Sequence, residues 1–234
     1  MNTVTRGRFV TLEGLEGVGK STNGASLAEA LRAAGHRVLT TREPGGTPLG
    51  ERLRALVLES GGTMRAETEL LLMSASRVEH VAEVIEPALA RGEWVLCDRF
   101  LDASVAYQGG GRGLGMAFVA RLHAELGVTL SPDLTFLLDM PVGGSLDRMR
   151  ARGRPDRIER EGEAFFERAR DAYLARAAAD PERVVIVDAA RPLDEVWASI
   201  VAALAERLGV ALDPSLRSVG PAPSDEDAGD GTPR

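Results

Sequence analysis

Five short apolar runs are spaced along the chain, and longer segments with apolar residues at helical spacing lie between them. The runs are nearly continuous in apolar residues, which is typical of strands that helices cover on both faces. Alternation of such strands with helices is typical of repeated βαβ units. The pattern therefore predicts an α/β fold with one parallel sheet between two layers of helices. The strands are expected at 8–14, 37–43, 93–99, 134–140 and 183–189.

Helical periodicity and cap residues predict the main helices. The first helix has Leu27 and Leu31 on one face and is expected to end at Gly35, a residue type favoured after helix C-termini. The third segment contains Pro87, whose ring and missing N–H predict an interruption there. The helices are expected at 21–35, 47–59, 66–90 and 193–208.

The length of 234 residues and the hydrophobic content of 44% suit a single domain with one substantial core. We expect this domain to span 8–209, after a flexible N-terminal segment at 1–7. Residues 210–234 are rich in Pro, Gly, Ser and Asp, which is typical of a disordered tail.

The formal net charge of −7 argues against a general nucleic-acid or acidic-membrane binder, because both need a basic face. The apolar runs are too short to span a bilayer, and the first residues lack the apolar stretch of a signal peptide. We therefore expect a cytoplasmic protein with no nucleic-acid and no membrane partner. The single cysteine, Cys97, is expected to be a small buried residue. The histidines are expected to be solvated or structural: His36, His80 and His123.

The segment "GLEGVGKST" matches the phosphate-binding pattern G-x-x-x-x-G-K-[ST] between a predicted strand and a predicted helix. Its backbone N–H groups would surround a nucleotide phosphate, Lys20 would reach the β/γ-oxygens and the Ser21 hydroxyl would ligate Mg²⁺. Lys20 is the only lysine among 28 basic residues. It stands where the compact charge of an ammonium group suits a phosphate-binding loop better than a guanidinium does. The predicted ATP-binding residues are Gly14, Leu15, Glu16, Gly17, Val18, Gly19, Lys20, Ser21 and Thr22.

Such a loop serves GTP switches, motor or clamp ATPases and phosphoryl-transfer enzymes. Lys20 is the sole lysine and the only asparagines are Asn2 and Asn23, so the base-reading Asn-Lys-x-Asp loop of a Ras-type GTPase is excluded. A motor or clamp ATPase usually brings further domains, for which this length leaves little room. A regulatory ATPase that binds a partner protein remains an alternative. A phosphoryl-transfer enzyme needs a carboxylate near the metal, an acceptor site and cations around the transferred group.

Asp98 and Arg99 follow a predicted core strand directly, at the edge where open α/β sheets bind ligands. Asp98 would orient Mg²⁺ or its water ligands, and Arg99 would contact an acceptor phosphate. The alternative interpretation of this pair is a structural ion pair.

The segment 148–160, "RMRARGRPDRIER", concentrates arginines around Gly153 and Pro155. Because arginines placed on transition-state charge strongly accelerate phosphoryl transfer, we interpret this segment as a mobile basic lid. Alternatives are a nucleic-acid patch or a solvated helix face, but the segment has no interleaved aromatic residues for base stacking.

Taken together, "GLEGVGKST", "TREPGGTPLGERLR", "DRFLDASVAYQGGGRG", "SPDLTFLLD" and "RARGRPDRIE" resemble, in order and spacing, the motifs of bacterial thymidylate kinases. The resemblance covers about residues 8–208. It implies a P-loop NTPase fold with a five-stranded parallel sheet, a homodimer, and Mg²⁺-dependent transfer of the ATP γ-phosphoryl group to dTMP. The products would be dTDP and ADP, for dTTP and DNA synthesis. A kinase of the same fold acting on another nucleoside monophosphate, or on shikimate, is the nearest alternative.

On the phosphate side, the resemblance makes Arg99 the ligand of the acceptor phosphate, with Arg42 and Glu43 lining the same side. Glu16 corresponds to a carboxylate that aligns this arginine and the sugar 3′-hydroxyl. Gly17 in place of an arginine matches the subtype that takes its catalytic arginines from the lid. The implied catalytic residues are Lys20, Arg99, Arg152, Arg154 and Arg157.

On the base side, the resemblance assigns Arg77 to a base carbonyl, Ser104 and Gln108 to further base contacts, and Tyr107 to the sugar 2′ position. Met73 stands where the family usually has an aromatic residue. A thioether can also cover a base, because it is polarizable. Without the flanking motifs, Met73 would be interpreted as core and Arg77 as a surface residue.

Overall fold

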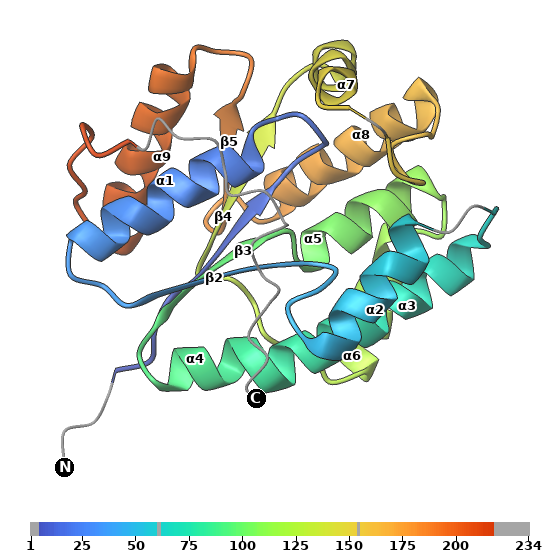
Figure 1. Ribbon diagram of the computed structural model, residues 1–234, viewed down its shortest axis with the longest axis horizontal. Coiled ribbons are helices and arrows are strands. Elements are labelled where there is room, and N and C mark those ends of the chain that lie inside the picture. The colour runs from blue at the N-terminus through green and yellow to red at the C-terminus, as the bar shows by residue number, and fades with distance from the viewer. Residues whose placement is uncertain (1–4, 60–61, 154, 218–234) are drawn as a thin grey trace, which may run out of the picture.

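The computed structural model describes residues 5–59, 62–153 and 155–217. Five parallel strands form one sheet in the order β2-β3-β1-β4-β5, with helices packed on both faces (Figure 1). The α/β architecture predicted from the sequence is confirmed. The strands are β1 (Phe9–Glu13), β2 (Val38–Arg42), β3 (Trp94–Asp98), β4 (Leu134–Asp139) and β5 (Val184–Asp188).

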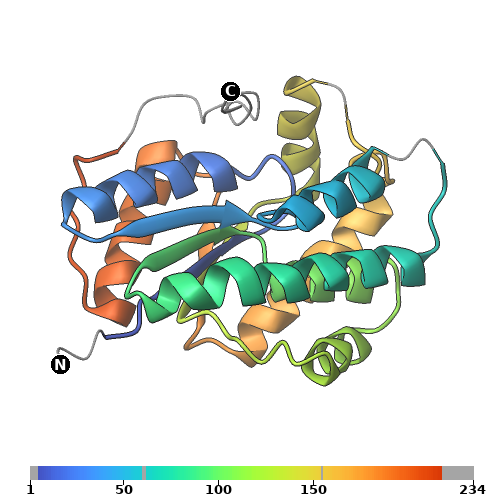
Figure 2. The same ribbon diagram turned by 60° about the horizontal axis from the view of Figure 1, so that its bottom comes forward.

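Helices connect the strands and form the outer layers. Figure 2 shows α1 on one face of β2 and β3, and α4 with the preceding helix α3 on the other face. The helices are α1 (Lys20–Ala33), α2 (Pro48–Leu58), α3 (Ala66–His80), η1 (Val81–Ile85), α4 (Glu86–Ala90), α5 (Leu101–Ser104), η2 (Val105–Gly111), α6 (Met116–Glu125), α7 (Val142–Ala151), α8 (Glu163–Ala179) and α9 (Leu193–Leu208). In the described parts of the chain, no helix is both long and apolar enough to cross a membrane.

The register of the sheet brings the ends of its central strands together. Asp98 at the end of β3 lies opposite Leu12 of β1 and Arg42 of β2. Every residue of β1 is buried, as expected for a central strand covered on both faces. Polar residues at the carboxyl ends of these strands therefore share one edge of the sheet, where a doubly wound fold binds its ligand.

The interruption predicted near Pro87 takes the form of a wider turn rather than a break. The helical region continues from α3 into the π-helical segment η1 and then into α4, where Pro87 occupies the first turn. A proline is tolerated in the first turn of a helix, because the N–H groups there are not all needed for hydrogen bonds within that helix. Here the first turn of α4 directly follows the π-helical segment. The second helix begins as predicted, with the Thr47 side chain accepting from the Gly50 N–H at 2.9 Å.

Both ends of the predicted domain have packed residues beyond the expected bounds. Gly7 is buried and its N–H donates to the Leu89 carbonyl at 2.8 Å. In the segment predicted to be a tail, Leu212 is buried and the Pro214 carbonyl accepts from the Trp197 indole at 2.9 Å. Of the two predicted terminal segments, residues 1–4 and 218–234 lie outside the described residues.

Cys97 is buried in β3 as expected. Burial and nearby carboxylates raise the pKa of its thiol well above the ordinary value, so this side chain is an inert part of the core.

Candidate active site

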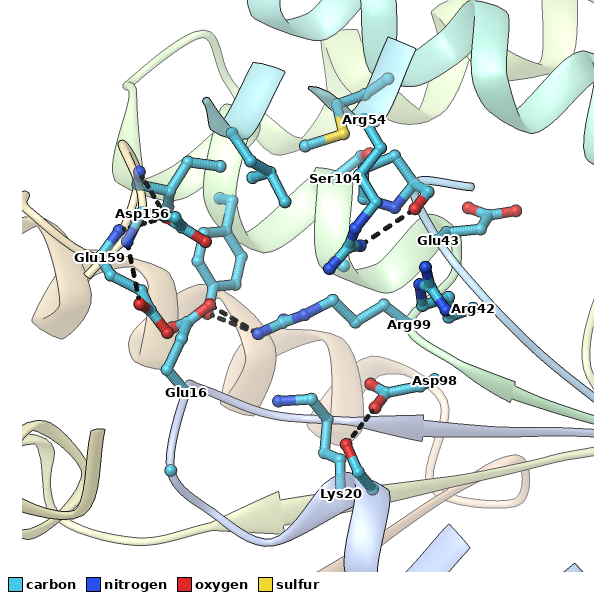
Figure 3. Close-up of a pocket in the computed structure, with 18 of the residues that line it drawn as sticks. Glu16, Lys20, Arg42, Glu43, Arg54, Asp98, Arg99, Ser104, Asp156 and Glu159 are labelled. Carbon is cyan, nitrogen blue, oxygen red and sulfur yellow. Dashed lines mark hydrogen bonds and ion pairs between the residues drawn. The ribbon is translucent and has the colours of Figure 1, made fainter. Parts of the chain in front are cut away.

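A cavity of about 560 Å³ opens at the carboxyl edge of the sheet. The loop after β1, the end of β2, α3, the end of β3, η2 and the segment after α7 all contribute to its lining. Figure 3 shows Glu16, Lys20, Asp98 and Arg99 converging on the same space. The cavity therefore joins the predicted phosphate loop to the predicted acceptor side.

The phosphate loop turns sharply at glycines before α1 begins. Gly14 and Gly19 have φ values of 128° and 93°, which other residues adopt only with strain. Lys20, the first residue of α1, folds back so that Nζ donates to the carbonyls of Gly14 at 3.1 Å and Leu15 at 2.6 Å. Burial, together with repulsion from Arg99, lowers the pKa of Lys20 to about 8. The loop thus holds its cation close to where a phosphate would lie.

Ser21 and Asp98, the two residues predicted to serve Mg²⁺, lie in contact. The Ser21 hydroxyl donates to Oδ2 of Asp98 at 3.0 Å. A hydroxyl and a carboxylate oxygen are hard donors that suit Mg²⁺, which keeps several waters and relies on substrate phosphates for other ligands. No cluster of three His, Cys, Asp or Glu suited to a metal occurs in the described residues. The donor set fits a magnesium ion bound mainly through nucleotide and water.

Arg99 occupies the centre of the cavity on a strained backbone, with φ of 71°. Its Nη2 donates to Oε1 of Glu16 at 2.6 Å, and Nη1 donates to the Gly14 carbonyl at 3.0 Å and to the Tyr173 hydroxyl at 3.2 Å. Its guanidinium carbon lies 4.9 Å from the centre of the Tyr107 ring. A rigidly held guanidinium in a cavity is suited to binding an anion.

Glu16 and Tyr107 complete this arrangement. The Tyr107 hydroxyl donates to Oε2 of Glu16 at 2.6 Å. Burial alone would raise the pKa of Glu16, but the charges of Arg99 and Lys20 and the Tyr107 hydrogen bond lower it below the usual range. Burial raises the pKa of Tyr107 well above its ordinary value, so the phenol keeps the proton that it donates.

Glu13 supports the loop after β3 from below the cavity. It is buried, and its carboxylate accepts from the Phe100 N–H at 2.7 Å and from the Tyr173 hydroxyl at 2.8 Å. Burial and the neighbouring Asp102 raise the pKa of Glu13 to about 8. Because Phe100 follows Arg99 and Tyr173 contacts it, Glu13 helps to hold Arg99 in its strained conformation.

Arg77 lies at the other end of the cavity and is almost fully buried. Its Nε donates to Glu43 at 2.6 Å and its Nη1 to Ser104 at 3.0 Å. Further hydrogen bonds join Nη1 to the His123 ring at 2.6 Å and Nη2 to the Phe100 carbonyl at 2.9 Å. These bonds to described residues use four of the five N–H groups of a guanidinium. One N–H on Nη2 is left for a ligand.

The buried histidines hold this end of the cavity in place. Burial and the adjacent Arg77 lower the pKa of His123 to about 4, so the ring is neutral at neutral pH. Its Nδ1–H then donates to the Val119 carbonyl at 2.9 Å, and Nε2 accepts from Arg77. His80 bridges Glu43 and Thr41. Both are structural, in agreement with the sequence-based expectation.

The remaining base-side candidates also reach the cavity. Met73, Ser104 and Gln108 line it, together with Arg42 and Glu43 of the acceptor side. Glu43 serves this end indirectly as well, because it holds both Arg77 and His80. Arg42 pairs with Glu51 at 3.1 Å.

The arginine-rich segment meets the cavity with only some of its members. Arg152 lines the cavity and lies 3.4 Å from Glu159, with 59% of its side chain exposed. Arg157 is buried away from the lining, where Nε donates to the Val57 carbonyl at 2.6 Å and Nη2 to Glu69 at 2.5 Å. Arg154 lies outside the described residues. The catalytic roles expected of Arg154 and Arg157 stay predictions, and only Arg152 of the three is seen at the cavity.

Several residues of the cavity were given no individual role from the sequence, although three of them lie in the segment 148–160 interpreted as a lid. Arg54, Asp156 and Glu159 line the cavity, and Arg148 does so while donating to the Ala189 carbonyl at 3.1 Å. The available signal for Arg54 was its place in the motif "TREPGGTPLGERLR", which also contains Arg42 and Glu43 of the acceptor side. Asp156 and Glu159 belong to the segment interpreted as a lid, but only the path of the loop between α7 and α8 shows that these two carboxylates reach the cavity.

The family model for thymidylate kinase matches residues 12–200. A thymidylate kinase of Pseudomonas savastanoi pv. phaseolicola (strain 1448A / Race 6) is 60% identical over 195 residues, which cover 83% of this chain and 93% of that protein. The chain belongs to the thymidylate kinase family. A thymidylate kinase of Bordetella petrii is 57% identical over 199 residues, which cover 85% of this chain and 95% of that protein.

The fold agrees with this thymidylate kinase assignment. The crystal structure of a thymidylate kinase from Ehrlichia chaffeensis aligns with a TM-score of 0.69 at 31% identity, and the alignment covers 85% of this chain and 98% of that chain. The resemblance stated from the motifs is therefore confirmed at the level of the family and of the fold.

Two further carboxylates at the ends of strands, Asp139 of β4 and Asp188 of β5, form hydrogen bonds outside the cavity. Asp139 accepts two hydrogen bonds from Arg170, both at 2.8 Å. Asp188 accepts from the Ala190 N–H at 3.0 Å. Neither lines the cavity.

Proposed function

We propose that this chain transfers the γ-phosphoryl group of ATP to dTMP, giving dTDP and ADP for dTTP and DNA synthesis. The observation that carries the proposal is the cavity in which Arg99, paired with Glu16 of the phosphate loop, lies between that loop and the base-side residues. An acceptor phosphate on Arg99 would then face a nucleotide on the loop. This arrangement suits direct transfer between two bound phosphates.

The proposed dTMP site uses the cavity from end to end. The base lies against Met73 and meets Arg77, Ser104 and Gln108, while the sugar lies beside Tyr107 and Glu16. The acceptor phosphate binds Arg99, with Arg42 and Glu43 on the same side. Because the Tyr107 hydroxyl is held on Glu16, its ring restricts the space at the sugar 2′ position and favours deoxyribose.

Catalysis requires no strong base, because an acceptor phosphate oxygen is already a nucleophile. The chain positions the two anions and neutralises their charge. Lys20 exchanges the Gly14 and Leu15 carbonyls for phosphate oxygens, and Arg152 reaches the transferring group from the segment after α7. Ser21 and Asp98 would hold Mg²⁺, directly or through water, and the bound ion supplies positive charge to the nucleotide phosphates.

We also propose a homodimer, as the family resemblance implies. Apolar side chains are exposed along α2, α3 and α6, which lie side by side with α3 in the middle. These side chains are Leu49, Leu56, Leu71, Val78 and Phe118. A row of exposed apolar residues over three neighbouring helices suits contact with a second copy of the chain. We place the reaction in the cytoplasm, where a buried free thiol such as Cys97 is the usual state.

The proposed activity is tested by measuring ADP formation with ATP and Mg²⁺ against a panel of acceptors. The panel holds dTMP, dUMP, dCMP, UMP, AMP, GMP and shikimate. We expect strong stimulation by dTMP, weaker stimulation by dUMP and little by UMP. Preferred use of another acceptor would overturn the dTMP site while keeping the kinase. No stimulation by any acceptor would contradict the kinase and favour a regulatory ATPase.

A further inference from the structure

Glu69, in the first turn of α3, is a fully buried carboxylate that the proposed mechanism does not use. Oε1 accepts from Nε2 of Gln108 at 2.9 Å and from Nε of Arg112 at 3.2 Å, and Oε2 accepts from Nη2 of Arg112 at 3.0 Å and from Nη2 of Arg157 at 2.5 Å. Burial alone would raise the pKa of Glu69, but the hydrogen bonds from Arg112, Gln108 and Arg157 lower it. Glu69 is therefore an anion, and an ionised carboxylate can only accept hydrogen bonds.

This contact decides which end of the Gln108 amide faces the cavity. Since Glu69 can only accept, the NH₂ group of Gln108 must turn toward it, and the amide oxygen is left on the other side. Gln108 lines the cavity, and no described residue donates a hydrogen bond to the oxygen of its side-chain amide. A bound base therefore meets an acceptor at Gln108 and a donor at Arg77.

A donor beside an acceptor distinguishes the pyrimidines. Thymine offers a carbonyl oxygen next to an N–H, which matches this pair. Cytosine offers an amino group next to an unprotonated ring nitrogen, so both of its groups would meet like partners. A pocket that binds its ligand through buried hydrogen bonds is selective because a wrong ligand leaves the polar groups of the pocket without partners.

We propose that Glu69 is a positioning residue that sets base selectivity by holding the Gln108 amide with its oxygen toward the base. This inference rests on the proposed function, since it concerns the dTMP pocket. Glu69, Met73 and Arg77 follow one another at intervals of four residues along α3, so they share one side of the helix. One helix thus carries the residue that orients Gln108, the residue that covers the base and the residue that meets a base carbonyl.

The first test is the substitution Glu69→Gln. Arg112 and Arg157 would hold the oxygen of the new amide, and its NH₂ group would face Gln108 and turn that amide around. We expect the ratio of kcat/KM for dTMP over dCMP to fall about tenfold, the size of one well-placed hydrogen bond. In a Gln108→Leu background, the same substitution should leave the ratio unchanged, because Glu69 acts through Gln108.

Glu161→Gln is the matched control. Glu161 also pairs with Arg112, but it has no hydrogen bond to Gln108, so the ratio should stay within about twofold of wild type. A ratio unchanged in Glu69→Gln, or one that falls equally in the Gln108→Leu background, overturns the inference. Failure of the proposed function itself would show separately, as absence of dTMP phosphorylation by the wild-type enzyme.

A second measurement uses the wild-type protein and does not depend on the stability of a variant. Gln108 is the only glutamine in the chain, so labelling glutamine side chains with ¹⁵N gives one NH₂ signal. We expect its protons to exchange slowly with water in the free enzyme, because the NH₂ group is buried on Glu69. Rapid exchange would show that the NH₂ group faces the open cavity and would contradict the proposal.

Discussion

Individual residues of the site are held in place by charged and polar groups rather than by apolar packing alone. Arg99 is fixed by Glu16, the Gly14 carbonyl and Tyr173, and Arg77 by Glu43 and Ser104. Groups held in this way need little reorganisation when an anion or a base arrives, which is the physical basis of electrostatic preorganisation. Arg152 differs, because its side chain is mostly exposed.

That exposure makes Arg152 a test of the catalytic role. In Arg152→Ala we expect kcat to fall by roughly 100-fold or more while KM for dTMP changes little, because the guanidinium acts on charge that develops during transfer. Steady-state kinetics with varied dTMP measure both constants.

Arg150→Ala is the control for this substitution. Arg150 is an exposed neighbour on α7 that pairs with Asp147 at the surface, so its removal should alter kcat by less than about twofold. Equal losses in kcat and in dTMP affinity for Arg152→Ala would move that residue out of the catalytic role.

At the scale of elements, the site depends on how closely α8 packs against η2. A Cβ atom at Gly110 would lie 2.6 Å from the Cβ of Ala172 and 2.9 Å from the Arg168 carbonyl oxygen. Tyr107 and Gln108 of η2 line the cavity, while Gly110 and Gly111 of η2 lie against α8. The glycine run therefore serves the close approach of two helices, a role that the motif alone does not reveal.

We accordingly expect Gly110→Ala to lower the free energy of unfolding by about 1–3 kcal/mol, because α8 must move to admit the methyl group. Urea denaturation monitored by circular dichroism measures the change. Gly143→Ala is the matched control, since a Cβ atom there meets nothing within 4 Å and a helical alanine is favoured by up to about 1 kcal/mol. A Gly110→Ala protein as stable as wild type would show that the two helices separate without cost.

At the scale of the whole molecule, the strand order places β1 and β3 side by side, although residues 14–93 lie between them in the chain. Asp98 and Arg99 thereby meet the phosphate loop, and β2 brings Arg42 alongside. The neighbouring helices α2, α3 and α6 each leave apolar side chains exposed.

The proposed homodimer predicts a change of mass on altering this face. Leu71 is 59% exposed in the single chain, so Leu71→Glu should fold normally but prevent association through the cost of burying a charge. Sedimentation equilibrium should give the mass of two chains for wild type and of one chain for the variant. Ile186→Glu, at a similarly exposed position on β5 (51%), should stay dimeric. A monomeric wild type would refute the homodimer.

Sequence reasoning located the strands and the last helix closely, because continuous apolar runs and helical periodicity are local signals. The predicted helix at 193–208 agrees with α9, and each strand begins and ends within two residues of its predicted bounds. It also assigned Ser21 and Asp98 to the same site, and the structure has them in contact because the loop after β1 and the end of β3 lie at the same edge of the sheet. The wide turns of η1 and η2 were not anticipated, because they depend on packing between helices.

By itself, therefore, the sequence determined the α/β layout, the phosphate loop and the family, since each is written in consecutive residues or in the order of motifs. The tertiary structure alone decided which way these residues point: Arg152 toward the cavity, Arg157 onto Glu69, and the NH₂ group of Gln108 onto that same carboxylate. The contacts of Arg157 and Gln108 with Glu69 join residues far apart in the chain, and burial makes them selective for a partner of opposite charge or matching hydrogen-bonding capacity.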